Sequence, residues 1–115
     1  MSFEARTERV GTGTVVTFIG ELDIASEAPA TAAFEAALGD GGGVLVADLR
    51  ELAFLDSTGV RVLLTAHLHA TKKGMRFGVA RAEDGMVRKL IEVTRIDQRF
   101  PVVDDPAELT QDAAQ

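Results

Sequence analysis

Strand-like and helix-like patterns of apolar residues follow one another along the chain. Residues 3–9 alternate apolar or small side chains with charged ones, and residues 14–19 are rich in β-branched and aromatic side chains. With the turn signal Gly11-Thr12-Gly13 between them, these stretches predict a β-hairpin. The acidic segment Gly20-Glu21-Leu22-Asp23 is too short to form an element of its own and is expected to be a loop.

Beyond residue 25, stretches with helical spacing alternate with short apolar runs. We expect Ser26 and Asp84 to cap two of the helices, because short polar side chains accept hydrogen bonds from the free N–H groups of a first turn. The glycine-rich run 39–43 ends the first helix and lacks the Lys-Ser or Lys-Thr of a phosphate-binding loop, so a flexible connection is expected. The expected helices begin near residues 26, 57, 84 and 105, and the strands between them cover residues 44–47, 75–80 and 100–103.

The order of the expected elements is β-β-α-β-α-β-α-β-α, which predicts an α/β fold. Strands that alternate with helices form a largely parallel sheet with helices packed against it, and the first hairpin makes that sheet mixed. Pro101 cannot donate a backbone hydrogen bond, so its strand is expected at an edge of the sheet. Without an internal repeat, residues 1–115 form a single domain, ordered from about residue 3 to 112 with frayed termini.

Composition restricts the classes of function. The chain has 18 acidic and 12 basic residues, a net charge of −6, which argues against nucleic acid or an anionic membrane as the main partner. It has no cysteine, so it has neither disulfides nor thiolate metal sites, as is typical of a reducing cytoplasm. No apolar run approaches the roughly 20 residues that span a bilayer. Four acids without a base nearby in the sequence lie near the C-terminus: Asp104, Asp105, Glu108 and Asp112.

Neither a metal site nor an enzyme is indicated by the polar residues. His67 lies on the apolar stripe of the helix that begins near residue 57, so it is expected in the core or at its boundary. His69 lies off that stripe, and residues two apart point to different faces of a helix, so the two do not form a metal pair. The residues around Ser57 lack the Gly-x-Ser-x-Gly pattern of a nucleophilic serine.

The stretch Leu52–Val60 carries the candidate chemistry. Its apolar run ends in Asp56, Ser57, Thr58 and Gly59, and an amphipathic helix begins at once. Such residues supply acceptors for the free N–H groups of a helix start, and the positive end of the helix dipole accommodates a phosphate. Ser57 is therefore either a phosphorylatable residue or only a helix cap, and Asp56 either caps the helix or steers an incoming kinase.

Three motifs in this order carry a resemblance to a known family: Gly20-Glu21-Leu22-Asp23, Asp48-Leu49-Arg50-Glu51-Leu52 and Phe54-Leu55-Asp56-Ser57-Thr58-Gly59-Val60. With the order of the elements, they closely resemble the STAS domain of bacterial anti-sigma factor antagonists over nearly the whole chain. The resemblance implies that Ser57 is phosphorylated by a partner that is both a serine kinase and an anti-sigma factor. It also implies a partner-binding surface made of Gly20, Glu21, Leu22, Asp23, Asp56, Ser57, Thr58 and Gly59.

The same resemblance implies a regulatory binding protein rather than an enzyme. The unphosphorylated form binds the anti-sigma factor and frees a sigma factor, phosphorylation of Ser57 releases that partner, and a phosphatase resets the switch. We expect a cytoplasmic monomer that forms heterocomplexes, without a cofactor. A phosphate adds about −1.5 to −2 charges, which the dipole and free N–H groups of the helix start are expected to hold without a change of fold. Gly59 either lets a partner approach Ser57 or is simply a small residue in the first turn.

Two other interpretations stay open at this point. A STAS domain that binds partners without being phosphorylated fits the same residues. Alternatively, Asp48, at the end of a buried strand, superficially resembles the phosphate-accepting aspartate of a response-regulator receiver. That site needs a further acidic pair at the end of the first strand to bind magnesium, which Glu8-Arg9-Val10 does not supply. Thr58 is a less favoured second phosphorylation site.

Overall fold

The computed structural model describes residues 2–39 and 43–110 of the 115-residue chain. Residues 1, 40–42 and 111–115 lie outside the described residues. The flexible connection predicted at residues 39–43 and the fraying predicted at the termini fall largely on them. Within the described ranges, no helix is both long enough and apolar enough to cross a membrane.

The predicted hairpin is present, and its second strand is longer than expected. β1 (Phe3–Val10) pairs antiparallel with β2 (Gly13–Leu22). β2 includes Gly20, Glu21 and Leu22, so the prediction of a loop was wrong for these three residues. The reason is tertiary, because β4 (Leu52–Leu55) pairs in parallel with this end of β2 and supplies its hydrogen-bonding partners.

β4 is the strand that the sequence pattern did not predict. It has four residues, with two exposed residues between two buried leucines, and so shows neither the alternation nor the continuous burial of a typical strand. The register shifts between Gly20 and Glu21 where β4 pairs with β2. At Gly20, φ is +101° and an added Cβ would lie 2.2 Å from the carbonyl oxygen of Ser2, so this position requires glycine.

The remaining strands pair in parallel, as predicted. β3 (Val44–Asp48), β5 (Arg76–Ala80) and β6 (Val102–Val103) complete a sheet with the order β1-β2-β3-β5-β6, and β4 lies off this path beside β2. β6, directly after Pro101, forms an edge of the sheet. The fold is therefore confirmed as α/β with a mixed, largely parallel sheet.

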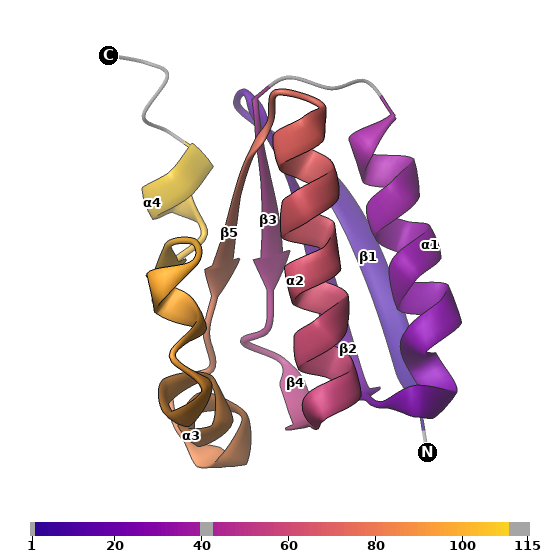
Figure 1. Cartoon of the computed structure of the whole chain (residues 1–115), viewed down its shortest axis with the longest axis vertical. Coiled ribbons are helices and arrows are strands. Elements are labelled where there is room, and N and C mark those ends of the chain that lie inside the picture. Colours follow the sequence, from indigo (N-terminus) through magenta and orange to yellow (C-terminus); the bar gives the residue numbers. More distant parts are fainter. Residues whose placement is uncertain (1, 40–42, 111–115) are drawn as a thin grey trace.

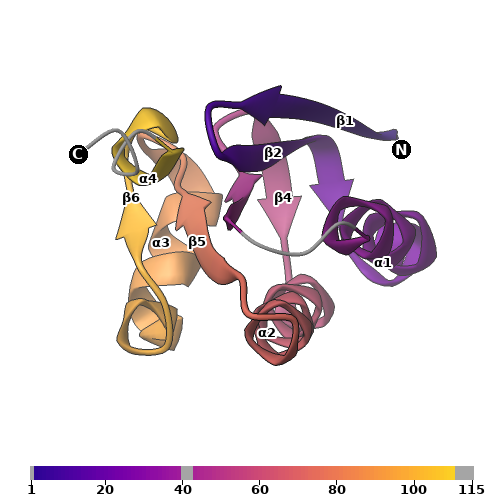
Figure 2. The same cartoon turned by 90° about the horizontal axis from the view of Figure 1, so that it is seen from above.

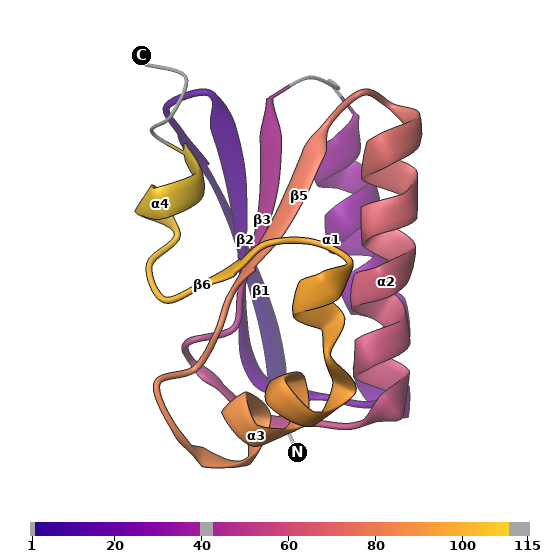
Figure 3. The ribbon, with the colours of Figure 1, turned by 60° about the vertical axis from the view of Figure 1, so that its left-hand side comes forward.

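All four predicted helices are present, on two sides of the sheet. α1 (Glu27–Leu38) and α2 (Ser57–Lys72) lie side by side on one face (Figures 1 and 2). α3 (Gly85–Thr94) contacts β4, and the short α4 (Ala107–Thr110) lies on the opposite side of the sheet from α1 and α2 (Figure 3). The pair α1–α2 leaves both helix starts at the same end of the molecule, where β2 and β4 end.

The core between the sheet and α1–α2 contains a chain of aromatic contacts. Phe34 packs edge-on against Phe77, and Phe77 packs edge-on against Phe100, with ring centroids 6.0 and 4.9 Å apart. The half-buried His67 ring lies 6.0 Å from Phe77 and 5.3 Å from Phe100, which confirms it as a core-boundary residue. His69 instead places Nδ1 3.1 Å from Oε2 of Glu35 on α1.

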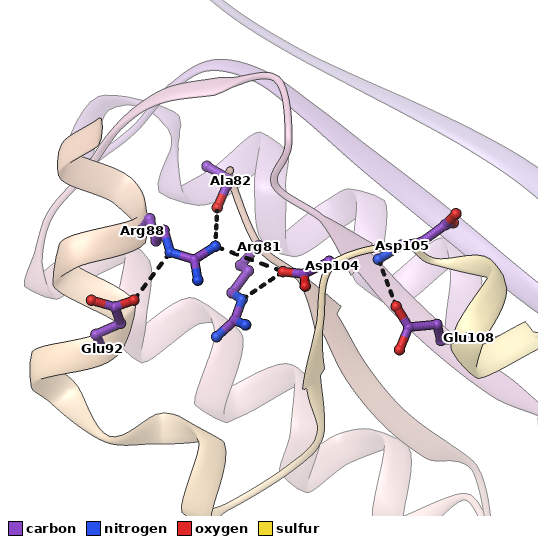
Figure 4. A network of polar contacts seen from close by, with 7 residues as sticks. All are labelled: Arg81, Ala82, Arg88, Glu92, Asp104, Asp105 and Glu108. Atoms are coloured by element: carbon purple, nitrogen blue, oxygen red, sulfur yellow. Dashed lines mark hydrogen bonds and ion pairs between the residues drawn. The ribbon is translucent and has the colours of Figure 1, made fainter. Parts of the chain in front are cut away.

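A polar network attaches α3 to the edge of the sheet (Figure 4). Arg81 donates to Asp104 at 2.9 Å, and Arg88 of α3 donates to the carbonyl oxygen of Ala82 at 3.3 Å and to Glu92 at 3.1 Å. Arg88 also lies 3.7 Å from Asp104. The fold therefore brings two bases to an acid that has none nearby in the sequence, and the hydrogen bond from Arg81 lowers the pKa of Asp104.

Candidate functional site

The carboxyl ends of β2 and β4 bring the two acidic motifs together. Leu22 pairs with Leu55 in the parallel register, so Asp23 and Asp56, which follow them, leave the sheet side by side. Asp23 leads through a 3-10 turn (Ile24–Ser26) into α1, and Asp56 leads directly into α2. The two motifs therefore meet at the lower end of the molecule in Figure 1, beside the starts of both helices.

Ser57 is the first residue of α2, and it is exposed. The cap of the helix is Asp56, whose Oδ1 accepts hydrogen bonds from the N–H groups of Thr58 at 3.0 Å and Gly59 at 3.2 Å. The carbonyl oxygen of Asp56 accepts the N–H of Val60 at 3.0 Å. Of the roles that the sequence left open, capping therefore belongs to Asp56, while the Ser57 side chain stays at the surface.

This cap changes the expectation for a phosphate on Ser57. The N–H groups of Thr58, Gly59 and Val60 already have their acceptors in Asp56. The prediction that free N–H groups would hold the phosphate is therefore wrong for these three donors. The helix dipole still stabilises a phosphate at this position, but the phosphate competes with the carboxylate of Asp56 for the same N–H groups.

Gly59 and Leu22 support the site from the inside. Gly59 is buried, and an added Cβ would lie 2.9 Å from the carbonyl oxygen of Leu22 and 2.4 Å from Cδ1 of Leu55. Leu22 has no exposed surface. Gly59 is thus the small residue that lets the first turn of α2 rest on the end of β2. Because both residues are buried, neither Leu22 nor Gly59 belongs to the exposed part of the predicted partner surface.

The segment after β2 is held by a capping box. Asp23 Oδ1 accepts hydrogen bonds from the N–H groups of Ala25 at 3.0 Å and Ser26 at 3.2 Å, and the Ser26 hydroxyl accepts the N–H of Asp23 at 2.9 Å. The Ser26 hydroxyl also donates to the carbonyl oxygen of Glu21 at 2.7 Å. Ser26 occupies the N-cap position of α1 as predicted, but its side chain makes no capping hydrogen bond to that helix. Its role is to fix the turn that carries the acidic motif.

Glu21 and Ile24 give this end of the molecule the properties of a contact surface. Within the described part of the chain, Glu21 Oε1 is buried and has no hydrogen-bond partner. Glu21, Asp23, Phe3 and Pro29 line a hollow of about 200 Å³. Ile24, next to it in the turn, is 76% exposed. A buried carboxylate oxygen requires a donor, and an exposed apolar side chain beside it favours contact with a protein.

Three residues beside the site were not predicted from the sequence. Arg61 on α2 donates from Nη2 to Oε2 of Glu27 on α1 at 2.9 Å. The spacing of Arg61, four residues after Ser57 on one helix, was a visible signal, as was the isolated apolar Ile24 after the acidic motif. Glu27 could not have been found, because its contact spans 34 residues and depends on how α1 packs beside α2.

Asp48 does not have the surroundings of a phosphate-accepting aspartate. It is buried at the end of β3, and Arg50 binds both of its carboxylate oxygens, with Nε to Oδ1 and Nη2 to Oδ2 at 3.0 Å each. The hydrogen bond to Asp48 raises the pKa of Arg50. Among the residues that the structure describes, no group of three or more His, Cys, Asp or Glu side chains is placed to hold a metal ion. The geometry therefore does not support the receiver-like interpretation.

Comparison with known proteins gives one family and several similar structures. A family model described as "Mlab, STAS domain" matches residues 5–104. An anti-sigma factor antagonist from Mycobacterium paratuberculosis has a similar structure, with a TM-score of 0.87 and 26% sequence identity over 99% of this chain and 96% of that chain. No curated protein matches the sequence.

Two further structures share the fold at lower identity. The anti-sigma factor antagonist SpoIIAA, in its unphosphorylated form, has a TM-score of 0.70 and 18% identity over 98% of this chain and 97% of its own. An anti-sigma-factor antagonist (STAS) domain protein from Planctomyces limnophilus has a TM-score of 0.73 and 18% identity over 96% of this chain and 98% of its own. At these identities the likeness shows the fold alone.

Proposed function

This chain belongs to the family of STAS domains, and we propose that it acts as an anti-sigma factor antagonist controlled by phosphorylation of Ser57. Its unphosphorylated form binds an anti-sigma factor that is also a serine kinase, which frees a sigma factor. Phosphorylation of Ser57 ends that complex, and a phosphatase restores the binding form. In this role the protein binds and regulates, and it does not catalyse a reaction.

The placement of Ser57 is the observation that carries this proposal. Ser57 is exposed as the first residue of α2, at the end of the molecule where Asp23 and Asp56 meet. The Asp56 cap and the contact of Gly59 with β2 fix the backbone on both sides of the hydroxyl. An exposed hydroxyl on a well-anchored turn can enter the active site of a kinase while the domain stays folded.

The surroundings of Ser57 suit a protein partner. Glu21 has a buried oxygen that lacks a donor, and Ile24 presents an apolar side chain to solvent. We expect the anti-sigma factor to supply a hydrogen-bond donor to Glu21 and an apolar contact to Ile24. The partly exposed Asp56 and Thr58 flank Ser57 within the same contact. Gly20, Leu22 and Gly59 shape this surface from beneath.

The proposed modification is a phosphoryl transfer from ATP held by the partner. The Ser57 Oγ–P bond forms, the bond between the γ-phosphorus and the β–γ bridging oxygen breaks, ADP leaves, and the hydroxyl proton passes to a base of the kinase. The product carries about −1.5 to −2 charges at neutral pH. Burying an unpaired charge in the interface costs several kcal/mol, and about 4 kcal/mol corresponds to a thousandfold loss of affinity.

Substitution of Ser57 tests the switch. We expect Ser57→Ala to bind the purified anti-sigma kinase as tightly as the wild type and to take up no phosphate from ATP. Ser57→Asp should bind at least about tenfold more weakly, because it adds one of the two charges that the phosphate brings. Titration calorimetry measures the affinities, and intact mass measures the uptake of phosphate.

Thr58→Ala is the matched control, because it removes the neighbouring hydroxyl in the same helical turn and should still take up one phosphate. An adduct on Ser57 is stable to acid, whereas hydroxylamine would release an acyl phosphate from Asp48. Equal binding by the wild type, Ser57→Ala and Ser57→Asp, without phosphate uptake, would instead identify a STAS binding module that is not switched.

A further inference from the structure

Arg61 is placed to interact with whatever charge Ser57 acquires. The two residues lie four apart on α2, a spacing that brings their Cβ atoms within about 5–6 Å on one face of a helix. Among residues 57–64, Arg61 is the only charged side chain. Its side chain is 65% exposed, and its one described ion pair is with Glu27 at 2.9 Å. The guanidinium is therefore within reach of position 57 and held by a partly exposed carboxylate.

A phosphate on Ser57 has few other donors nearby. The N–H groups of Thr58, Gly59 and Val60 are already bonded to Asp56, and Asp56 itself adds a negative charge beside the phosphate. Asp23 leaves the sheet next to Asp56 and adds another. Because these three backbone donors are occupied and two carboxylates lie nearby, a cation that can move towards the phosphate is the better counter-ion.

We propose that Arg61 is the internal counter-ion of phosphorylated Ser57, and that its guanidinium leaves Glu27 to pair with the phosphate. This inference rests on the proposed function only for the identity of the modified residue. A phosphate carries more charge than a carboxylate and accepts two parallel hydrogen bonds from a guanidinium. The pair with Glu27 is a surface ion pair of the kind that stabilises little, and Glu27 remains in contact with water when Arg61 leaves it.

The exchange has two consequences for the switch. The phosphate is held by a side chain instead of by the N–H groups that Asp56 occupies, so the first turn of α2 keeps its cap. At the same time Glu27 loses its cation, and the ion pair between α1 and α2 opens at the end of the molecule that carries Ser57. The modified surface then presents a phosphate together with a free Glu27 carboxylate.

Protein with phosphoserine incorporated during translation at position 57 tests this without a kinase. A pH titration followed by ³¹P NMR reports the second ionisation of the phosphate, and a nearby guanidinium lowers its midpoint by favouring the dianion. We expect Arg61→Gln to raise this midpoint by about 0.5 pH unit, the size of effect of an exposed ion pair. Arg61→Lys should recover part of the shift, and Glu27→Gln should leave the midpoint at or below that of the wild type, because the competing carboxylate is gone.

Lys72→Gln, at the other end of α2, is the matched control and should leave the midpoint where it is in the wild type. Equal midpoints for the wild type and Arg61→Gln would overturn the inference. Because no partner is present, this result is independent of the proposed function. If the phosphoserine protein binds the anti-sigma factor fully but Arg61→Gln shifts the midpoint, the switch is refuted and the role of Arg61 stands. If binding is lost but the midpoints are equal, the switch stands and the role of Arg61 is refuted.

Discussion

At position 59, packing outweighs helix propensity. Glycine in a helix is about 1 kcal/mol less favourable than alanine, yet Gly59 lies in the first turn of α2. The space beneath it is filled, because an added Cβ would meet Leu55 Cδ1 at 2.4 Å and the Leu22 carbonyl oxygen at 2.9 Å. The first turn of α2, which begins with Ser57, therefore packs closely against the ends of β2 and β4.

Gly59→Ala should therefore destabilise the domain. We expect a loss of about 1–3 kcal/mol in the free energy of unfolding, the usual penalty of forcing an extra group into a packed site. Urea unfolding measures the change. Gly39→Ala is the matched control, because Gly39 has a helical φ of −52° and, among the residues that the structure describes, an added Cβ there meets the Ala36 carbonyl oxygen alone, at 3.3 Å. The control should change stability by less than about 0.5 kcal/mol, and an equal loss in both variants would contradict the packing role of Gly59.

At the scale of the element, α2 and α3 begin in different ways although an aspartate precedes each. Asp56 caps α2 through two hydrogen bonds to backbone N–H groups. Asp84 holds the corresponding position before α3, with a similarly extended backbone, but makes no side-chain hydrogen bond to the helix. The aspartate of the functional site is thus a structural cap as well as a neighbour of Ser57.

This difference predicts unequal effects of two alanine substitutions. Asp56→Ala should lower the free energy of unfolding by about 1 kcal/mol, the usual contribution of a helix cap. Asp84→Ala should lower the free energy of unfolding by clearly less, because Asp84 makes no side-chain hydrogen bond to the helix. Chemical denaturation measures both, and amide hydrogen exchange should become faster at Thr58 and Gly59 in Asp56→Ala. Unchanged exchange at these two amides would show that the cap does not protect the first turn.

At the scale of the whole molecule, α3 is attached to the sheet edge by polar contacts as well as by its apolar stripe. Asp104, which follows β6, accepts a hydrogen bond from Arg81 after β5, and Arg88 of α3 approaches the same carboxylate (Figure 4). The hydrogen bond and the charge of Arg81 lower the pKa of Asp104 from its ordinary value of 3.8. Protonation of this carboxylate therefore weakens the link between β5, β6 and α3.

The sign of the resulting pH dependence follows from the direction of the shift. A carboxylate whose pKa is lower in the folded state stabilises the fold fully above its unfolded pKa, and this contribution is lost as the pH falls through the folded value. The difference in unfolding free energy between the wild type and Asp104→Asn should thus be constant above about pH 5 and shrink at lower pH. Denaturant titrations of both proteins at a series of pH values above and below about pH 5 measure this difference. In an Arg81→Gln background the difference should become clearly smaller, because Arg81 is the main partner of Asp104 and only the longer contact with Arg88 remains. An undiminished difference would contradict the role of Arg81.

The sequence by itself determined the elements and the residues that gather at the site. The period of apolar residues located the hairpin, the four helices and the edge strand directly after Pro101, because these patterns depend on local backbone geometry and on which face is buried. The motif around Ser57 was also recognisable, because helix starts select short polar side chains. The acidic motif at residues 20–23 was assigned to the same surface only through the resemblance to STAS domains.

Only the tertiary structure decided the partners of these residues. β4 became a strand because the end of β2 offers it backbone hydrogen bonds, although its own four residues lack a strand pattern. Gly59 is buried because the first turn of α2 packs against Leu22 at the end of β2 and Leu55 at the end of β4. The contacts of Arg61 with Glu27 and of Arg81 with Asp104 join residues 34 and 23 positions apart. Such pairings depend on how elements pack in space, and no local pattern of side chains encodes them.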